Sequence, residues 1–143
     1  MPGGVNRELV EASAVGRVRH FRELIVWQRS MELSLAIYDL TKDFPREEIY
    51  GLTSQMRRAS VSILSNIAEG HGRHSRLQLA NFTAMAKGSC YELEAQLLLA
   101  RELSYGTLDK FYRSQGLCNE VGRMLHSMLN KLQSPHESPQ TRT

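Results

Sequence analysis

The chain has 143 residues, a length typical of one domain, which excludes a second hydrophobic core. Apolar residues make up 41% and charged residues 23%, which indicates a soluble globular protein and excludes wholesale disorder. Two cysteines are too few to staple such a chain, so a disulfide-rich secreted scaffold is excluded. The formal net charge of +3 is modest and does not by itself indicate a nucleic-acid partner.

The sequence pattern offers no segment that would enter a membrane. Apolar runs such as Leu97–Ala100 are far shorter than the roughly 20 residues that span a bilayer. Near the start of the chain, Arg7, Glu8 and Glu11 interrupt any apolar signal core. We therefore expect a cytoplasmic protein with no membrane partner.

The spacing of the prolines divides the chain into three parts. No proline occurs between Arg46 and Ser134, a run typical of helical proteins. We predict a flexible N-terminal leader over residues 1–19, where a short helix around residues 7–15 remains open. A helical domain is expected over residues 20–133, and a polar, disordered tail over residues 134–143.

The first long helix is predicted over residues 21–43 and is apolar on two opposite faces. The first stripe consists of Leu24, Trp27, Met31, Leu35 and Tyr38. The second stripe consists of Val26, Leu33, Ile37 and Leu40. Since a helix of a thin bundle buries one face, the other must meet a second molecule. We assign the second stripe, with Val61 and Leu64 of the next helix, to an oligomer interface.

Three more helices follow at the 3.6-residue period. The second begins near Pro45 or Thr53 and ends near Glu69, and Gly70 is expected to cap it with a positive φ. Its inward residues are predicted to be Ile49, Leu52, Met56, Ala59, Ile63, Asn66 and Gly70. The chain is thus predicted to be all-α, an antiparallel up-down four-helix bundle that assembles into a ring-like homo-oligomer.

The third helix is predicted from an N-cap at Ser75 to about Ser104, and the fourth from an N-cap at Thr107 to Ser134. Gly88 inside the third helix indicates a close crossing with a neighbouring helix. The expected inward residues of the third helix are Leu79, Phe82, Ala86, Ser89, Leu93, Leu97 and Ala100. Those of the fourth are Leu108, Phe111, Cys118, Val121, Leu125, Met128 and Leu132.

Positive charge is concentrated in the middle of the chain. Residues 55–88 contain one anion, Glu69, against five cations: Arg57, Arg58, Arg73, Arg76 and Lys87. Residues 89–109 reverse the balance, with Arg101 against Glu92, Glu94, Glu102 and Asp109. The five cations either bind nucleic-acid phosphates or pair with carboxylates of a neighbouring subunit. In a ring, rotational symmetry would repeat the cluster as a basic belt.

Several segments resemble a known bacterial family. They are Tyr50-Gly51-Leu52, Gln55 to Ala59, Asn66 to Gly70 with Arg73, and Gly88-Ser89 with Glu92 to Glu94. Over about residues 21–132 the chain resembles the four-helix bundle proteins encoded within intervening sequences of 23S ribosomal RNA genes. It is also similar to the accessory subunit of diversity-generating retroelements. This resemblance implies a homo-oligomer, in particular a pentamer, that contacts RNA or DNA, works beside a reverse transcriptase and has no catalytic activity.

The segment Asn66-x-x-Glu69-Gly70-x-x-Arg73 is the most suggestive constellation of polar residues. A catalytic interpretation makes Glu69 a general base, with His71 or His74 as its partner. A structural interpretation, which we prefer, has Asn66 bonding backbone across the helix seam and Glu69 pairing with Arg73 or Arg58. His71 and His74 lack two further ligands at a fitting spacing, so we predict neither a metal site nor a cofactor. Cys90 and Cys118 are expected to be inert core thiols.

Three functions remain open. The preferred one is a non-enzymatic scaffold that contacts nucleic acid or a nucleic-acid enzyme. The second is an adaptor that binds proteins alone. The third, which we favour least, is a small helical hydrolase or nuclease, because no histidine follows an arginine at the spacing of helical-bundle ribonucleases.

Overall fold

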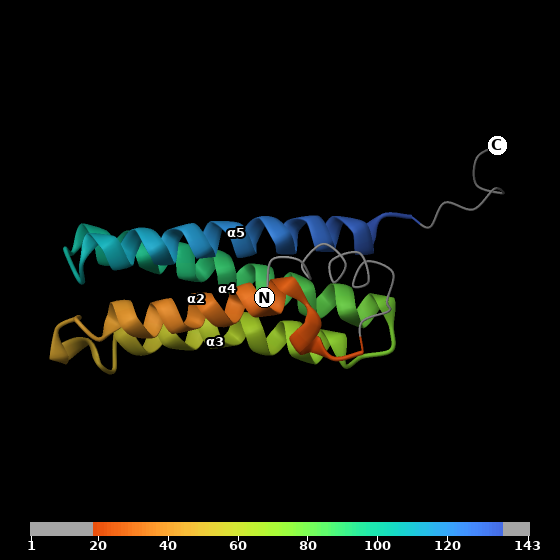
Figure 1. Cartoon of the computed structure of the whole chain (residues 1–143), viewed down its shortest axis with the longest axis horizontal. Coiled ribbons are helices and arrows are strands. Elements are labelled where there is room, and N and C mark those ends of the chain that lie inside the picture. Colours follow the sequence, from red (N-terminus) through yellow and green to blue (C-terminus); the bar gives the residue numbers. More distant parts are fainter. Residues whose placement is uncertain (1–18, 136–143) are drawn as a thin grey trace.

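The computed structural model describes residues 19–135, which form four long helices lying side by side (Figure 1). Going around the bundle, each helix packs against the next one in the chain, and the last packs against the first. The described residues contain no strand, so the predicted all-α four-helix bundle is confirmed. The elements are η1 (Phe21–Glu23), α2 (Ile25–Thr41), η2 (Arg46–Glu48), α3 (Leu52–His71), α4 (Arg76–Glu102) and α5 (Leu108–Gln133).

The predicted leader and tail fall almost entirely outside the described residues, which begin at Arg19 and end at Pro135. Within them, none of the helices has both the length and the apolar character needed to cross a membrane.

The residues predicted to face inward on α3, α4 and α5 are buried or half-buried, except for two that are exposed. Ile49 is 52% exposed and Leu108 is 57% exposed. Ile49 lies just after η2 and Leu108 is the first residue of α5, so both sit at the rim of the bundle rather than between helices. Elsewhere the predicted seams supply much of the buried cluster, including Met56, Ile63, Leu93, Leu97, Phe111, Val121 and Leu125.

The assignment of the two faces of α2 was wrong. Leu33, Ile37 and Leu40 are completely buried and Val26 is 7% exposed, so the second stripe forms the core of a single chain. These four side chains are therefore not available to a second copy. The C-terminal half of the first stripe faces outward instead, with Leu35 63% exposed and Tyr38 44% exposed.

Small polar residues explain why the second stripe turns inward. Ser30 and Ser34 lie on the same buried side of α2 and leave room for α3 to approach. The Ser30 hydroxyl donates to the carbonyl of Val26 at 2.7 Å. The Ser34 hydroxyl donates to the hydroxyl of Ser60 on α3 at 2.9 Å. The helical period reveals both apolar faces but does not show which one these close contacts will select.

Two glycines play different parts from those predicted. Gly70 lies inside α3 and needs no positive φ, because the helix continues to His71 and its C-cap, Gly72, has φ −74°. Its role is close packing, since a Cβ there would lie 2.8 Å from the Cβ of Phe82 on α4. Gly88 marks no close crossing within the chain, because a Cβ on it would meet nothing within 4 Å.

The helix starts are capped as the sequence predicts at two positions. The hydroxyl of Ser75 accepts from the Gln78 N–H at 3.2 Å, and that of Thr107 accepts from the Lys110 N–H at 3.5 Å. The cap of α3 was not predicted. There the Glu48 carboxylate accepts from the Leu52 N–H at 3.0 Å and from the Tyr105 hydroxyl at 2.9 Å.

Gly51 makes this cap possible, because a Cβ on it would lie 2.5 Å from Oε1 of Glu48. The Leu52 N–H, followed by the Tyr105 hydroxyl, lowers the pKa of Glu48 below its usual value.

Glycine replacements should have opposite effects at two positions. Gly116 in α5 faces open space, so Gly116→Ala should raise the free energy of unfolding by about 0.5–1 kcal/mol through helix propensity. Gly106 has φ +75° and a Cβ there would lie 2.6 Å from Cδ1 of Leu40, so Gly106→Ala should lower it by about 1–3 kcal/mol. Urea denaturation of both variants measures the two changes in the free energy of unfolding. Changes of the same sign would contradict the structure.

The Glu48 cap should also give stability a pH dependence. Because the folded pKa lies below the usual 4.5, the carboxylate stabilises the fold above about pH 4.5, and this contribution is lost as the pH falls through the folded pKa. Glu48→Gln should therefore be less stable than the natural chain at pH 7, and the difference should shrink in acid. Thermal unfolding of both proteins at a series of pH values measures it, with Glu47→Gln as the control. A difference independent of pH would contradict the cap.

Candidate functional site

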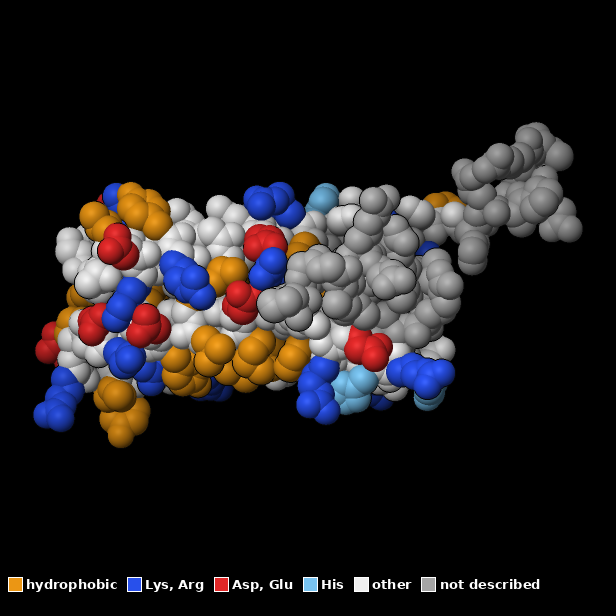
Figure 2. Space-filling model, viewed as in Figure 1, with side chains coloured by type: hydrophobic (Ala, Val, Ile, Leu, Met, Phe, Trp, Pro, Cys, Tyr) orange, Lys and Arg blue, Asp and Glu red, His pale blue; other side chains and the backbone are white. Residues whose placement is uncertain are grey.

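An apolar strip runs along the outside of the bundle over α2 and α3. Figure 2 shows a row of hydrophobic side chains along this side of the molecule. We call it the outer stripe and define it as Met31, Leu35 and Tyr38 of α2 with Val61 and Leu64 of α3. The contact between Ser34 and Ser60 places their neighbours Leu35 and Val61 on adjacent positions of the two helices. The outer stripe thus retains two predicted interface residues, Val61 and Leu64, beside part of the first stripe.

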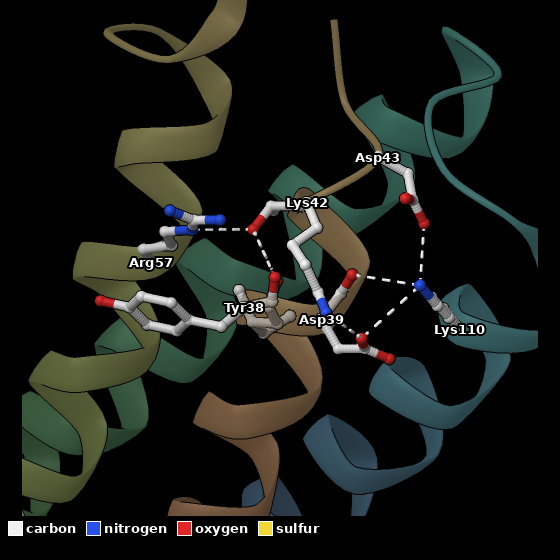
Figure 3. A network of polar contacts seen from close by, with 8 residues as sticks. Tyr38, Asp39, Lys42, Asp43, Arg57 and Lys110 are labelled. Carbon is white, nitrogen blue, oxygen red and sulfur yellow. Dashed lines mark hydrogen bonds and ion pairs between the residues drawn. The ribbon is translucent and has the colours of Figure 1, made fainter. Parts of the chain in front are cut away.

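Arg57 borders the outer stripe and is held in place by two contacts (Figure 3). Its Nε donates to the hydroxyl of Thr41 at 2.9 Å, and Thr41 in turn donates to the carbonyl of Ile37 at 2.7 Å. The guanidinium also lies 4.6 Å from the centre of the Tyr38 ring. Arg57 is therefore a half-buried link between α2 and α3, whereas Arg58 is exposed.

The same end of α2 is tied to α5 by Lys110 (Figure 3). Its ammonium lies 2.8 Å from the Asp43 carboxylate and 3.5 Å from that of Asp39. The hydrogen bond to Asp43, followed by the charge of Asp39, raises the pKa of Lys110. Lys42 forms a second ion pair with Asp39 at 3.3 Å, and its hydrogen bond is the main cause that lowers the pKa of Asp39. These ion pairs are surface contacts between helix ends.

The predicted basic residues do not form one continuous patch on a single subunit. Arg57 and Arg58 lie in the first turns of α3, whereas Arg73 and Arg76 follow its end, roughly 20 Å of helix away. Lys87 lies between α4 and α5, where its ammonium is 2.9 Å from Nδ1 of His126.

Arg73 and Arg76 flank the turn between α3 and α4, where each makes a structural contact. Arg73 pairs with Glu69 at 2.8 Å and lies over the ring of Phe82 at 5.2 Å. Arg76 donates to the carbonyls of Leu132 and Lys131 at 3.1 and 2.6 Å and so caps the end of α5. A guanidinium has five N–H donors, so both arginines keep donors for a further anion.

The Asn66 and Glu69 constellation has a largely structural geometry. Glu69 pairs with Arg73, as one of the predicted alternatives has it. The amide of Asn66 does not cross the seam directly; it donates to the carbonyl and hydroxyl of Ser62 on its own helix, at 2.9 and 3.0 Å. Ser62 then makes the contact with α4, through a 2.8 Å hydrogen bond with Ser89.

The histidines and cysteines bring no metal ligands together within residues 19–135, where no group of three or more His, Cys, Asp or Glu could hold an ion. His71 is half-buried and His74 is exposed in the turn after α3. Cys90 and Cys118 are both buried, as expected for core thiols, and lie side by side with their sulfurs 3.7 Å apart.

Residues 22–127 match the family described as 23S rRNA-intervening sequence protein. The chain belongs to this family. The match covers well over half of the chain and confirms the resemblance seen in the sequence. The relation to retroelement subunits is not part of this match and stays a prediction. No curated protein matches the chain.

One solved structure similar to this family member is a protein with unknown function from the S23 ribosomal protein family of Bacteroides thetaiotaomicron VPI-5482. The two share 23% sequence identity, with a TM-score of 0.66, over 73% of this chain and 98% of the other. This similarity supports the fold and assigns no activity to the 23S rRNA-intervening sequence protein described here.

Part of the positive charge in this 23S rRNA-intervening sequence protein was not predicted from its sequence. The up-down topology brings η1, the end of α3, the start of α4 and the end of α5 to one end of the bundle. Figure 2 shows Lys, Arg and His side chains gathered near η1 and the end of α3. We call this the basic end and define it by Arg19, Arg22, Arg73, Arg76 and Lys131. Only the pairing of segments distant in sequence assembles it, so no local pattern would have revealed it.

A cavity of about 340 Å³ opens beside the basic end. It is lined mainly by apolar side chains at α2, α4 and α5, together with Arg76, Arg123 and Lys131. Among the described residues, the three cations Arg22, Arg76 and Lys131 have no carboxylate partner.

Proposed function

We propose that this chain is a non-enzymatic, homo-oligomeric helical-bundle scaffold that contacts nucleic-acid phosphates through its basic end. The observation that carries the proposal is the composition of that end, where five cations accompany two carboxylates, Glu23 and Glu69. Arginine makes up four of the five, and its guanidinium binds phosphate oxygens in a bidentate way. In an oligomer with rotational symmetry this end is repeated, which strengthens a sequence-independent attraction to RNA or DNA.

Two separate apolar surfaces support self-association. One is the outer stripe of α2 and α3. The other is the outer face of α4, where large exposed side chains alternate with small ones: Leu77, Ala84, Gly88, Tyr91, Ala95, Leu98 and Leu99. A ring requires two different surfaces on each subunit that fit one another head to tail. We propose that the outer stripe of one copy packs on the α4 face of the next, in a pentamer or another closed ring.

The carboxylates of α4 offer a second role for the arginines. Glu92, Glu94 and Glu102 are exposed and form no ion pair with a cation of residues 19–135. In a ring, these carboxylates can form ion pairs with Arg58 of the adjacent copy, because Arg58 lies next to the outward side of α3. We therefore assign phosphate binding to the basic end and subunit pairing to Arg58.

An adaptor that binds only proteins is the second candidate, and the exposed outer stripe favours it. The same apolar surface would then receive a different protein instead of a second copy. A nucleic-acid enzyme, such as a reverse transcriptase, fits either candidate as the partner.

Replacing Leu35 with a charged residue should dissociate the oligomer into single subunits. Leu35→Glu puts a charge in the centre of the outer stripe, where burying it against another copy is costly. Sedimentation velocity should show a large particle for the natural chain and one of 16.3 kDa for Leu35→Glu. Ile49→Glu is the matched control, because Ile49 is similarly exposed but lies outside both apolar surfaces, and this variant should remain assembled. A natural chain that sediments at 16.3 kDa would disprove self-association.

Binding to nucleic acid should depend on the basic end and on salt. Fluorescence anisotropy with generic RNA and DNA should show affinity that falls steeply with salt concentration. Arg73→Gln combined with Arg22→Gln should reduce the slope of log affinity against log salt by about one for each phosphate that a subunit no longer neutralises. Arg46→Gln, an exposed arginine at the opposite end, serves as the control and should bind as the natural chain does. If the intact oligomer showed no detectable binding to RNA or DNA at low salt, the nucleic-acid function would be disproved and the adaptor function would be favoured.

A further inference from the structure

The two cysteines face each other in the middle of the bundle, one on α4 and one on α5. Cys90 is 5% exposed and Cys118 is 2% exposed, and their sulfurs are 3.7 Å apart. Each thiol also contacts the backbone carbonyl of the other residue, at 3.4 Å from the Cys90 sulfur and 3.6 Å from the Cys118 sulfur. Such reciprocal contact keeps both side chains turned toward one another rather than toward separate apolar pockets.

Closing this gap into a bond requires a small movement. A disulfide has its sulfurs about 2.05 Å apart, so the two atoms must approach by roughly 1.7 Å. Gly122 of α5 lies beside the pair, and a Cβ on it would be 3.5 Å from the Cys90 sulfur. Because Gly122 has no side chain, this position of α5 leaves the space beside the Cys90 sulfur free of a Cβ.

Both helices are also weakened next to the thiols. Gly88 and Gly116 each stand two residues before a cysteine, and a Cβ on either would meet nothing within 4 Å. Packing within the chain therefore requires neither glycine, whereas both lower the local stability of a helix interior. Local opening of α4 and α5 near the thiols should therefore be more frequent than it would be with alanine at these two positions.

We propose that Cys90 and Cys118 form a modification site, an intramolecular dithiol that a peroxide converts into a disulfide joining α4 to α5. The Cys90 thiolate attacks one oxygen of hydrogen peroxide, the O–O bond breaks, and a sulfenic acid forms as hydroxide leaves. The sulfur of Cys118 then attacks the Cys90 sulfur, whose hydroxyl group leaves as water with the thiol proton of Cys118. In total, two thiols and one peroxide give one disulfide and two water molecules.

The contact between the thiols decides which sulfur reacts first. The hydrogen bond from Cys118 lowers the pKa of Cys90, although burial and the charge of Glu94 oppose this effect. The same hydrogen bond, with burial, raises the pKa of Cys118. Cys90, which is also the more exposed thiol at 5% against 2%, is therefore assigned as the one that attacks the peroxide, and Cys118 as the resolving thiol.

Oxidation of the full-length natural chain tests the site. The chain is treated with hydrogen peroxide and then with an alkylating reagent. Its intact mass should be lower by two hydrogen atoms, with no alkyl group added to either thiol. Peptide mapping should find Cys90 joined to Cys118. The disulfide should raise the Tm by about 5–10 °C, because it closes a long loop in the unfolded chain. Cys118→Ala should lack the Tm increase and instead gain oxygen at Cys90. Alkylation of both thiols after oxidation, or a disulfide between two chains, would overturn the proposal.

Glycine variants test the role of local opening. Gly116→Ala should slow disulfide formation several-fold relative to the natural chain, because it strengthens α5 next to Cys118. Gly72→Ala is the matched control, since Gly72 caps α3 far from the thiols along the chain, and it should oxidise at the natural rate. Equal rates for Gly116→Ala and the natural chain would show that opening of α5 does not limit the reaction and would overturn that step.

Discussion

Each helix of the bundle can bury one face in the interior, but α2 has two apolar faces. Burial of Leu33, Ile37 and Leu40 satisfies the hydrophobic effect for one of them. The other face cannot reach any remaining helix of the same chain, so Leu35 and Tyr38 stay in contact with water. This constraint produces the outer stripe, and from it comes the proposed assembly of several copies.

Polar contacts between small or half-buried side chains link neighbouring helices at mid-height. Ser34 bonds to Ser60 between α2 and α3, and Ser62 bonds to Ser89 between α3 and α4. The cysteine pair occupies the equivalent place between α4 and α5. Between α5 and α2, the corresponding contact is the ion pair of Glu120 with Arg29, at 3.0 Å. A layer of directional contacts of this kind fixes the vertical register of helices whose apolar seams would tolerate sliding.

The two ends of the bundle differ in charge because of the order of the helices. At one end, Lys110 neutralises Asp39 and Asp43, and Glu48 caps α3, so the charges there are largely used within the chain. At the basic end Arg73 pairs with Glu69, whereas Arg76 bonds to backbone carbonyls, which leave its positive charge in place. The proposed assembly and the proposed phosphate binding therefore use separate surfaces, the long sides and one end.

Local sequence patterns were enough to predict the number of helices, their approximate limits, the caps at Ser75 and Thr107 and the family, because these depend on periodicity, short-range hydrogen bonding and short motifs. The rotation of α2 was decided by packing, since both of its faces are apolar and the close fit of Ser34 against Ser60 distinguishes them. Packing likewise decided that Gly70 lets two helices approach, that Tyr105 bonds to the Glu48 carboxylate and that two cysteines 28 residues apart face each other. These features join atoms that are distant along the chain, and such distances are set by the contacts between helices rather than by any local pattern of residues.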